Sequence, residues 1–104
     1  MIVYEVNCLV NQSIFEKFKE WLPSHIKLLL AIEGFISAET YQILEDDQLS
    51  RKNNTLGISI RYYLKDEKTL SNYIKNHAEK LRKEGKDQFG SQFTAYRRVL
   101  LKST

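Results

Sequence analysis

Charged and amide side chains interrupt the strand-like stretches of this sequence. Glu5 and Asn7 lie two residues apart in the N-terminal run IVYEVNCLV. Glu39 and Arg61 occupy comparable positions in the later runs ISAETYQI and ISIRYYL. Residues two apart in a strand share one face of a sheet, so these side chains are expected on a common face. Two carboxylates with an arginine suit an acid–base group, and equally an ion network, because charges removed from water must be paired.

The chain has two histidines, the side chains that most readily carry protons near neutral pH. His25 follows Trp21 by four residues, a spacing that places both on one side of a helix. His77 lies within a run of apolar residues at helical spacing. Either histidine is a candidate proton carrier at a cavity. The simpler interpretation is structural, with His25 half covered by Trp21 and His77 hydrogen-bonded at the edge of the core.

The elements that position these residues follow from the hydrophobic period. Alternating and β-branched residues predict strands over residues 2–10, 35–44, 56–64 and 93–101. The polar, charged stretch 45–55 between two of them predicts a loop. Its acidic residues lack the spaced oxygen ligands of a calcium loop, so no metal site is expected.

Two helices are predicted between the strands. Apolar residues at spacings of three and four begin at Ile14, and Gly34 ends that helix. Pro23 removes a backbone donor within it, so a kink or break is expected near residues 21–23. The second stripe runs Leu70, Tyr73, Ile74, His77, Ala78 and Leu81, and Gly85 and Gly90 punctuate the segment that follows.

The resulting order is βαββαβ, which predicts an antiparallel four-stranded sheet with both helices on one face. Even-numbered residues of the first strand, Cys8 among them, are expected to face the helices. The open face is expected to carry the odd-numbered set and to bind a small polar or anionic molecule through Asn7, Glu39, Arg61, Tyr63 and Arg98. The parity of the last strand leaves open whether Arg97 or Arg98 points to that face.

A sheet with one uncovered face predicts self-association. Val3, Leu9, Phe35 and Tyr41 are expected on the open face beside its charges, so a homodimer is predicted. Residues 1–50 hold three Lys/Arg and eight Asp/Glu, whereas residues 51–104 hold thirteen and five. The net charge is therefore −5 for the first half and +8 for the second. This asymmetry is compatible with two halves of one fold that attract each other, or with an acidic and a basic patch that meet across a dimer. It also leaves open a basic binding face.

Composition restricts the remaining possibilities. The 104 residues fit one domain, 1–104, and 42% apolar with 28% charged residues is an ordinary globular balance. Cys8 is the single cysteine, which excludes an internal disulfide and favours the cytoplasm. No stretch is long and apolar enough to span a membrane. Gly-rich phosphate loops, CxxC, HExxH and GxSxG are absent from the sequence, which excludes several common enzyme classes.

Several segments together resemble a known family. MIVYEVN at the start, WL..HI before GF.SAE, RYYL, NHAEKLR and QFTAYRRVL are similar to an uncharacterised bacterial family, a domain of unknown function, within the dimeric α+β barrel superfamily. The resemblance covers nearly the whole chain. It implies a ferredoxin-like protomer that packs its open sheet face on a twin and encloses a cavity. It implies no activity, because superfamily members differ in function.

The resemblance adds two enzymatic alternatives. Haem-degrading members of the superfamily place an Asn on strand one and a His on the second helix at the cofactor, with a Trp, and Asn7 and His77 fall in similar places. The only tryptophan, Trp21, lies on the first helix instead, so we expect no cofactor. A cofactor-free monooxygenase or isomerase using His25 or His77 stays open, as does a nucleic-acid or regulatory binding module. The third strand lacks the aromatic RNA-binding motif, so nucleic acid is an unlikely partner.

Overall fold

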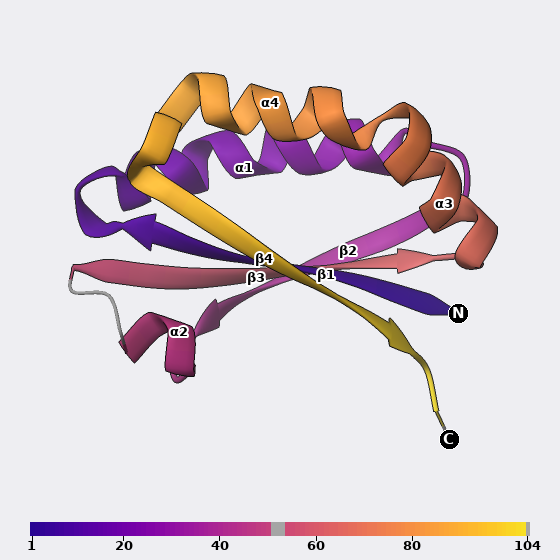
Figure 1. The fold of residues 1–104 in the computed structure, drawn as a ribbon, viewed down its shortest axis with the longest axis horizontal. Helices are drawn as coiled ribbons and strands as arrows, with labels where there is room; N and C mark the ends of the chain where they lie inside the picture. The colour runs from indigo at the N-terminus through magenta and orange to yellow at the C-terminus, as the bar shows by residue number, and fades with distance from the viewer. Residues whose placement is uncertain (51–53, 104) are drawn as a thin grey trace.

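The computed structural model describes residues 1–50 and 54–103 (Figure 1). Its strands are β1 (Ile2–Asn11), β2 (Phe35–Ile43), β3 (Thr55–Leu64) and β4 (Phe93–Leu101). Its helices are α1 (Phe15–Leu30), α2 (Asp47–Ser50), α3 (Glu67–Asn76) and α4 (Ala78–Phe89), with 3₁₀ turns at Gln12–Ile14 and Gly90–Gln92. The predicted βαββαβ order is confirmed.

All four strands form one antiparallel sheet in the order β2-β3-β1-β4. The central strand β1 places Glu5 between Arg61 of β3 and Arg98 of β4. The same register places Asn7 between Ser59 and Tyr96. The predicted ferredoxin-like α+β fold is therefore confirmed, and the register brings residues from distant parts of the chain to one row.

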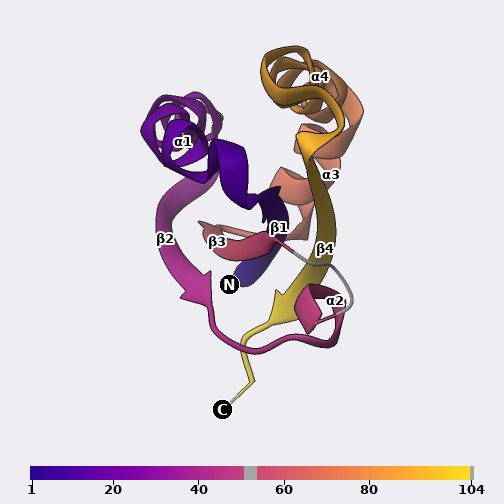
Figure 2. The same ribbon diagram turned by 90° about the vertical axis from the view of Figure 1, so that its left-hand side faces the viewer.

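Helices α1, α3 and α4 cover one face of this sheet (Figures 1 and 2). The even-numbered side chains of β1 and β3, such as Tyr4, Cys8 and Tyr62, are buried beneath them, as the alternation predicted. Phe35, expected on the open face, is instead buried in this core, where its ring contacts those of Tyr62 and Tyr73. The β-bulge between Phe35 and Ser37 accounts for the change of face.

The helices differ from the sequence prediction at two points. Helix α1 continues through Pro23 without the predicted break. One missing backbone hydrogen bond is tolerated there because Phe18, Leu22 and Leu29 anchor the helix in the core on both sides of the proline. The second stripe is divided at His77 into α3 and α4, which leaves Ile74 of the expected apolar stripe 47% exposed.

Two glycines lie where a side chain would crowd or strain its surroundings. Gly85 lies inside α4 and does not end it. A Cβ there would lie 3.1 Å from the Phe93 ring and 3.3 Å from Trp21. Gly34 has φ +93° in the turn after α1, and a Cβ there would lie 2.2 Å from the Thr69 hydroxyl. Both allow a helix or turn to approach its neighbour closely.

The sheet curls away from the helices at both edges. Figure 2 shows β2 and β4 bending toward the uncovered side, and α2 lies on that side next to the end of β2 (Figure 1). Part of the predicted loop 45–55 is thus the single turn α2, and residues 51–53 lie outside the described residues. The uncovered face is a trough whose floor is β1 and β3. Within the residues that the structure describes, no helix is long and apolar enough to cross a membrane.

Candidate functional site

The trough contains a hollow of about 440 Å³, a volume in the range of small-molecule sites. Glu5 lies on its floor and is only 1% exposed. Its carboxylate accepts hydrogen bonds from Arg98 Nε at 2.7 Å and Arg61 Nε at 3.2 Å. The Asn7 amide donates a third at 2.9 Å. A buried carboxylate is thus fully paired at the centre of the uncovered face.

The balance of effects at Glu5 favours its ionised form. Burial raises the pKa of this carboxyl, but the hydrogen bonds from Arg98 and Asn7 and the charges of Arg98 and Arg61 outweigh that effect, so the pKa lies below its ordinary value. Each arginine uses its Nε on Glu5, and arginine has further N–H donors on its terminal nitrogens. Both arginines line the hollow, and their side chains are 42% and 60% exposed.

Two carboxylate–tyrosine pairs flank this centre. Tyr63 and Tyr41 donate to Glu39, and Tyr96 donates to Asp46 in the segment before α2. Hydrogen bonds from Tyr63 and Tyr41 hold the pKa of Glu39 below its ordinary value. The bond to Asp46 raises the pKa of Tyr96 to about 12. Each of these carboxylates in the trough therefore has a tyrosine hydroxyl beside it as a hydrogen-bond donor.

The structure places all five predicted ligand-binding residues on the open face. Asn7, Arg61 and Arg98 converge on Glu5, whereas Glu39 and Tyr63 pair with each other. Arg98 faces the trough and Arg97 faces the helix side, which resolves the parity of β4. Residue-type reasoning omitted Asp46, Ser59 and Tyr96, which also line the hollow. The alternation of β3 and β4 points to Ser59 and Tyr96, but no signal in the sequence indicates that Asp46 folds back.

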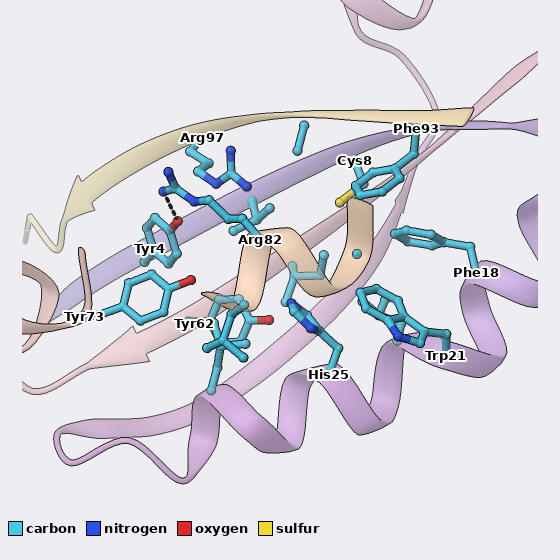
Figure 3. Close-up of a pocket in the computed structure, with 17 residues that line it drawn as sticks. Tyr4, Cys8, Phe18, Trp21, His25, Tyr62, Tyr73, Arg82, Phe93 and Arg97 are labelled. Atoms are coloured by element: carbon cyan, nitrogen blue, oxygen red, sulfur yellow. Dashed lines mark hydrogen bonds between the residues drawn. The ribbon is translucent and has the colours of Figure 1, made fainter. Parts of the chain in front are cut away.

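A second, interior cavity lies between the sheet and helices α1 and α4 (Figure 3). It encloses about 60 Å³, room for a few water molecules. Aromatic side chains form most of its wall, including Phe18, Trp21, Tyr62, Tyr73 and Phe93. Cys8 also lines it, and burial raises the pKa of this thiol to about 12, so it stays protonated. The predicted interpretation of Cys8 as a small core residue agrees with its 4% exposure.

His25 borders the interior cavity, stacked on Trp21 with ring centroids 4.5 Å apart. Its Nδ1 lies 3.6 Å from Glu84 Oε1, and this buried atom has no hydrogen-bond partner among the described residues. Burial lowers the pKa of His25 despite the nearby Glu84 charge, so the imidazole is neutral at pH 7. His77 lies at the junction of α3 and α4 and does not line this cavity.

Asn7 and His77, the two residues that the resemblance to haem-degrading enzymes singles out, do not lie at a common site. Asn7 lines the hollow on the open face, whereas His77 belongs to the helical layer on the other side of the sheet. No cluster of three His, Cys, Asp or Glu side chains suited to a metal ion occurs within residues 1–50 and 54–103.

Comparison with known proteins assigns the family. The model of a domain of unknown function, DUF4286, matches residues 1–103, so the chain belongs to this family. The predicted resemblance to an uncharacterised family is confirmed. No curated protein matches the chain.

Solved structures share the fold at low identity. SnoaB, a cofactor-independent oxygenase from Streptomyces nogalater, is 13% identical with a TM-score of 0.58, covering 99% of this chain and 94% of its own. A dimeric ferredoxin-like protein from an uncultured marine organism is 14% identical with a TM-score of 0.60, covering 99% and 97%. An ethyl tert-butyl ether D (EthD) family protein from Bacillus halodurans is 14% identical with a TM-score of 0.61, covering 99% and 100%.

Proposed function

We propose that the chain forms a homodimer through its open sheet face, and that the paired troughs bind a small polar molecule. The observation that carries the proposal is the hollow of about 440 Å³ over a fully paired, buried Glu5 on a face without helices. Exposed apolar side chains at its rim, Tyr41 and Leu44, supply area for a partner. The description of a structural neighbour as a dimeric ferredoxin-like protein supports the same arrangement.

The charges of the trough favour a polar ligand over a strongly anionic one. Arg61 and Arg98 are neutralised in part by Glu5, and Glu39 and Asp46 add two further carboxylates nearby. A ligand with both hydroxyl donors and acceptors would meet guanidinium N–H groups and carboxylate oxygens together. In this proposal Asn7, Arg61 and Arg98 contact the ligand from the floor, and Glu39 with Tyr63 contacts it from the side.

Dimerisation is tested by light scattering at micromolar concentration. The expected mass is twice the 12.3 kDa of one chain. Leu44→Asp places a charge on a side chain that is 84% exposed at the trough, so the variant should dissociate to monomers. Leu28→Asp is the matched control, because Leu28 is 45% exposed on α1 and lies in the helical layer. A wild-type monomer contradicts the dimer, and equal dissociation of both variants contradicts an interface on the open sheet face.

Ligand binding is tested by amide chemical shifts of the ¹⁵N-labelled protein titrated with xylitol, glucose and citrate. The neutral polyols are expected to shift the amides around Glu5, Asn7 and Ser59 more than citrate does. Arg98→Gln should weaken that response, whereas Arg97→Gln, the same change one residue away on the opposite face, should not. Shifts confined to the helical layer, or none with any probe, would remove the trough as a binding site.

A second candidate function is proton transfer in the interior cavity, as in a cofactor-free monooxygenase or isomerase. It is favoured by His25, a neutral imidazole at the wall of the cavity, since a neutral imidazole can accept a proton. The structural similarity to SnoaB supports it at the level of fold alone. Oxygen uptake with small phenols, compared between wild type and His25→Gln, tests it. Uptake that is absent, or unchanged in the variant, argues against this function.

A further inference from the structure

Two arginines border the interior cavity without an acidic partner. Arg82 of α4 donates from Nη2 to the Tyr4 hydroxyl at 3.1 Å, and Arg97 of β4 lies on the same helix-facing side of the sheet. Both are exposed, and neither lies within ion-pair distance of a carboxylate in residues 1–50 and 54–103. Figure 3 shows both guanidinium groups at the Tyr4 end of the cavity. Two cationic groups thus meet solvent at one end of an aromatic pocket.

The remainder of the cavity offers no competing charge. Its far end is formed by the rings of Phe18, Trp21 and Phe93. Burial raises the pKa of Tyr62 and Tyr73, so both hydroxyls stay neutral, and the nearby positive charge of Arg97 opposes the shift in each case. The cavity therefore combines an unpaired cationic entrance with a neutral, apolar interior.

We propose that this cavity binds a short-chain monocarboxylate, with its carboxylate between Arg82 and Arg97 and its apolar chain directed toward Trp21. Guanidinium groups bind planar carboxylates through paired N–H donors, and the apolar chain replaces water against the aromatic wall. The volume of about 60 Å³ is well below the ~300–1,000 Å³ typical of larger ligands, which limits the occupant to a small acid. This site is independent of the ligand proposed for the trough, because it opens on the opposite face of the sheet.

The sole tryptophan, Trp21, lines the cavity and reports on its occupant by fluorescence. Titration with butyrate should change the Trp21 emission in a saturable manner, whereas butyramide, which has a similar shape without the charge, should bind at least about tenfold more weakly. Inorganic phosphate should leave the emission unchanged because it has no apolar chain. An equal response to butyramide, or a saturable response to phosphate, would overturn the proposal.

Single variants locate the site. Arg97→Gln and Arg82→Gln should each weaken butyrate binding about tenfold. Arg98→Gln, the neighbouring arginine on the other face, should change it less than about twofold, since it lies outside the cavity. Circular dichroism verifies that each variant is folded, and Arg97→Gln suffices if Arg82→Gln is unstable. Butyrate affinity that depends on Arg98 and not on Arg97 would place the ligand in the trough and overturn the proposal.

A glycine variant tests the cavity without changing its charge. A Cβ at Gly85 would lie 3.1 Å from Phe93 and 3.3 Å from Trp21, so Gly85→Ala narrows the aromatic end. Butyrate binding should fall by at least about fivefold while acetate, which has a shorter chain, is affected less. Equal losses for both acids would show that the chain does not enter the cavity, and would overturn that part of the proposal.

Discussion

The two faces of the sheet use arginine in opposite ways. On the open face, Arg61 and Arg98 converge on Glu5, whose carboxylate is buried and ionised. On the helix-facing side, Arg82 donates to a tyrosine, and no carboxylate among the described residues pairs with it or with Arg97. Arg97 and Arg98 are adjacent in the chain, so strand alternation places them on opposite faces of the sheet, and the register with β1 sets Arg98 beside Glu5. The difference indicates that Arg61 and Arg98 are held by Glu5 and offer a ligand only their remaining N–H donors, whereas Arg82 and Arg97 carry charge that no carboxylate within residues 1–50 and 54–103 pairs.

The largest expected effect comes from removing the shared acid of the trough. Glu5→Gln keeps the shape of the side chain but leaves Arg61 and Arg98 without their counter-charge. The hydrogen bonds from Arg61 and Arg98 lose their charged acceptor, and because both arginines are partly exposed the free energy of unfolding should fall by about 2 kcal/mol. Urea denaturation measures the loss. Glu39→Gln is the control, because Glu39 lies on the same face but is exposed, and its free energy of unfolding should fall much less. Equal decreases in the two variants would contradict a special role for Glu5.

A sharper comparison uses the two adjacent arginines. Arg98→Gln removes the shortest hydrogen bond to Glu5, 2.7 Å, and should lower the urea midpoint. Arg97→Gln removes a charge with no acidic partner and should change stability by less than about 0.5 kcal/mol. The two variants have the same composition and net charge, so the comparison isolates the environment. A larger loss for Arg97→Gln would reverse the assignment of the two faces.

The unpaired arginines can be neutralised by design. Val99 is 54% exposed and lies two residues beyond Arg97 on the same side of β4. Val99→Glu supplies a carboxylate beside Arg97, so butyrate binding to the interior cavity should weaken about tenfold. Val99→Gln is the neutral control and should bind nearly as well as wild type. If both variants bind equally, the charge of Arg97 does not hold the ligand.

The smallest expected effect concerns the pH dependence set by His25. Its pKa in the native state lies below the ordinary 6.5, so the unfolded chain binds the proton first as the pH falls. Stability should therefore be fully present above about pH 7 and decrease as the pH falls below 6.5. His25→Phe, which keeps a ring against Trp21, should flatten this slope. Glu84→Gln removes the charge that favours protonated His25 and should steepen it; unchanged slopes in unfolding titrations would exclude His25 as the cause.

Much of the fold and part of the site could be predicted from the sequence. Burial on one face gives β1 and β3 their period-two pattern of apolar residues. This pattern predicts that Tyr4, Cys8 and Tyr62 lie in the core, as they do. The same alternation placed Glu5, Glu39 and Arg61 on the open face. The helix division at His77 was not predictable, because its stripe continues through residues 70–81 and no proline or glycine interrupts it. The helical Gly85 was missed because its reason, the closeness of Trp21 and Phe93, lies elsewhere in the chain.

By itself, the sequence determined the order of the strands and main helices and the face polarity of β1 and β3, since both depend on residues close together in the chain. Tertiary structure alone decided which charges are paired. The register of β1 with β3 and β4 unites Glu5 with arginines 56 and 93 residues away. The YRRV segment has two arginines in succession, and its apolar pattern is compatible with either parity. Only pairing with β1 turns Arg98 to Glu5 and Arg97 to the cavity, because an ion pair requires proximity that local pattern does not encode.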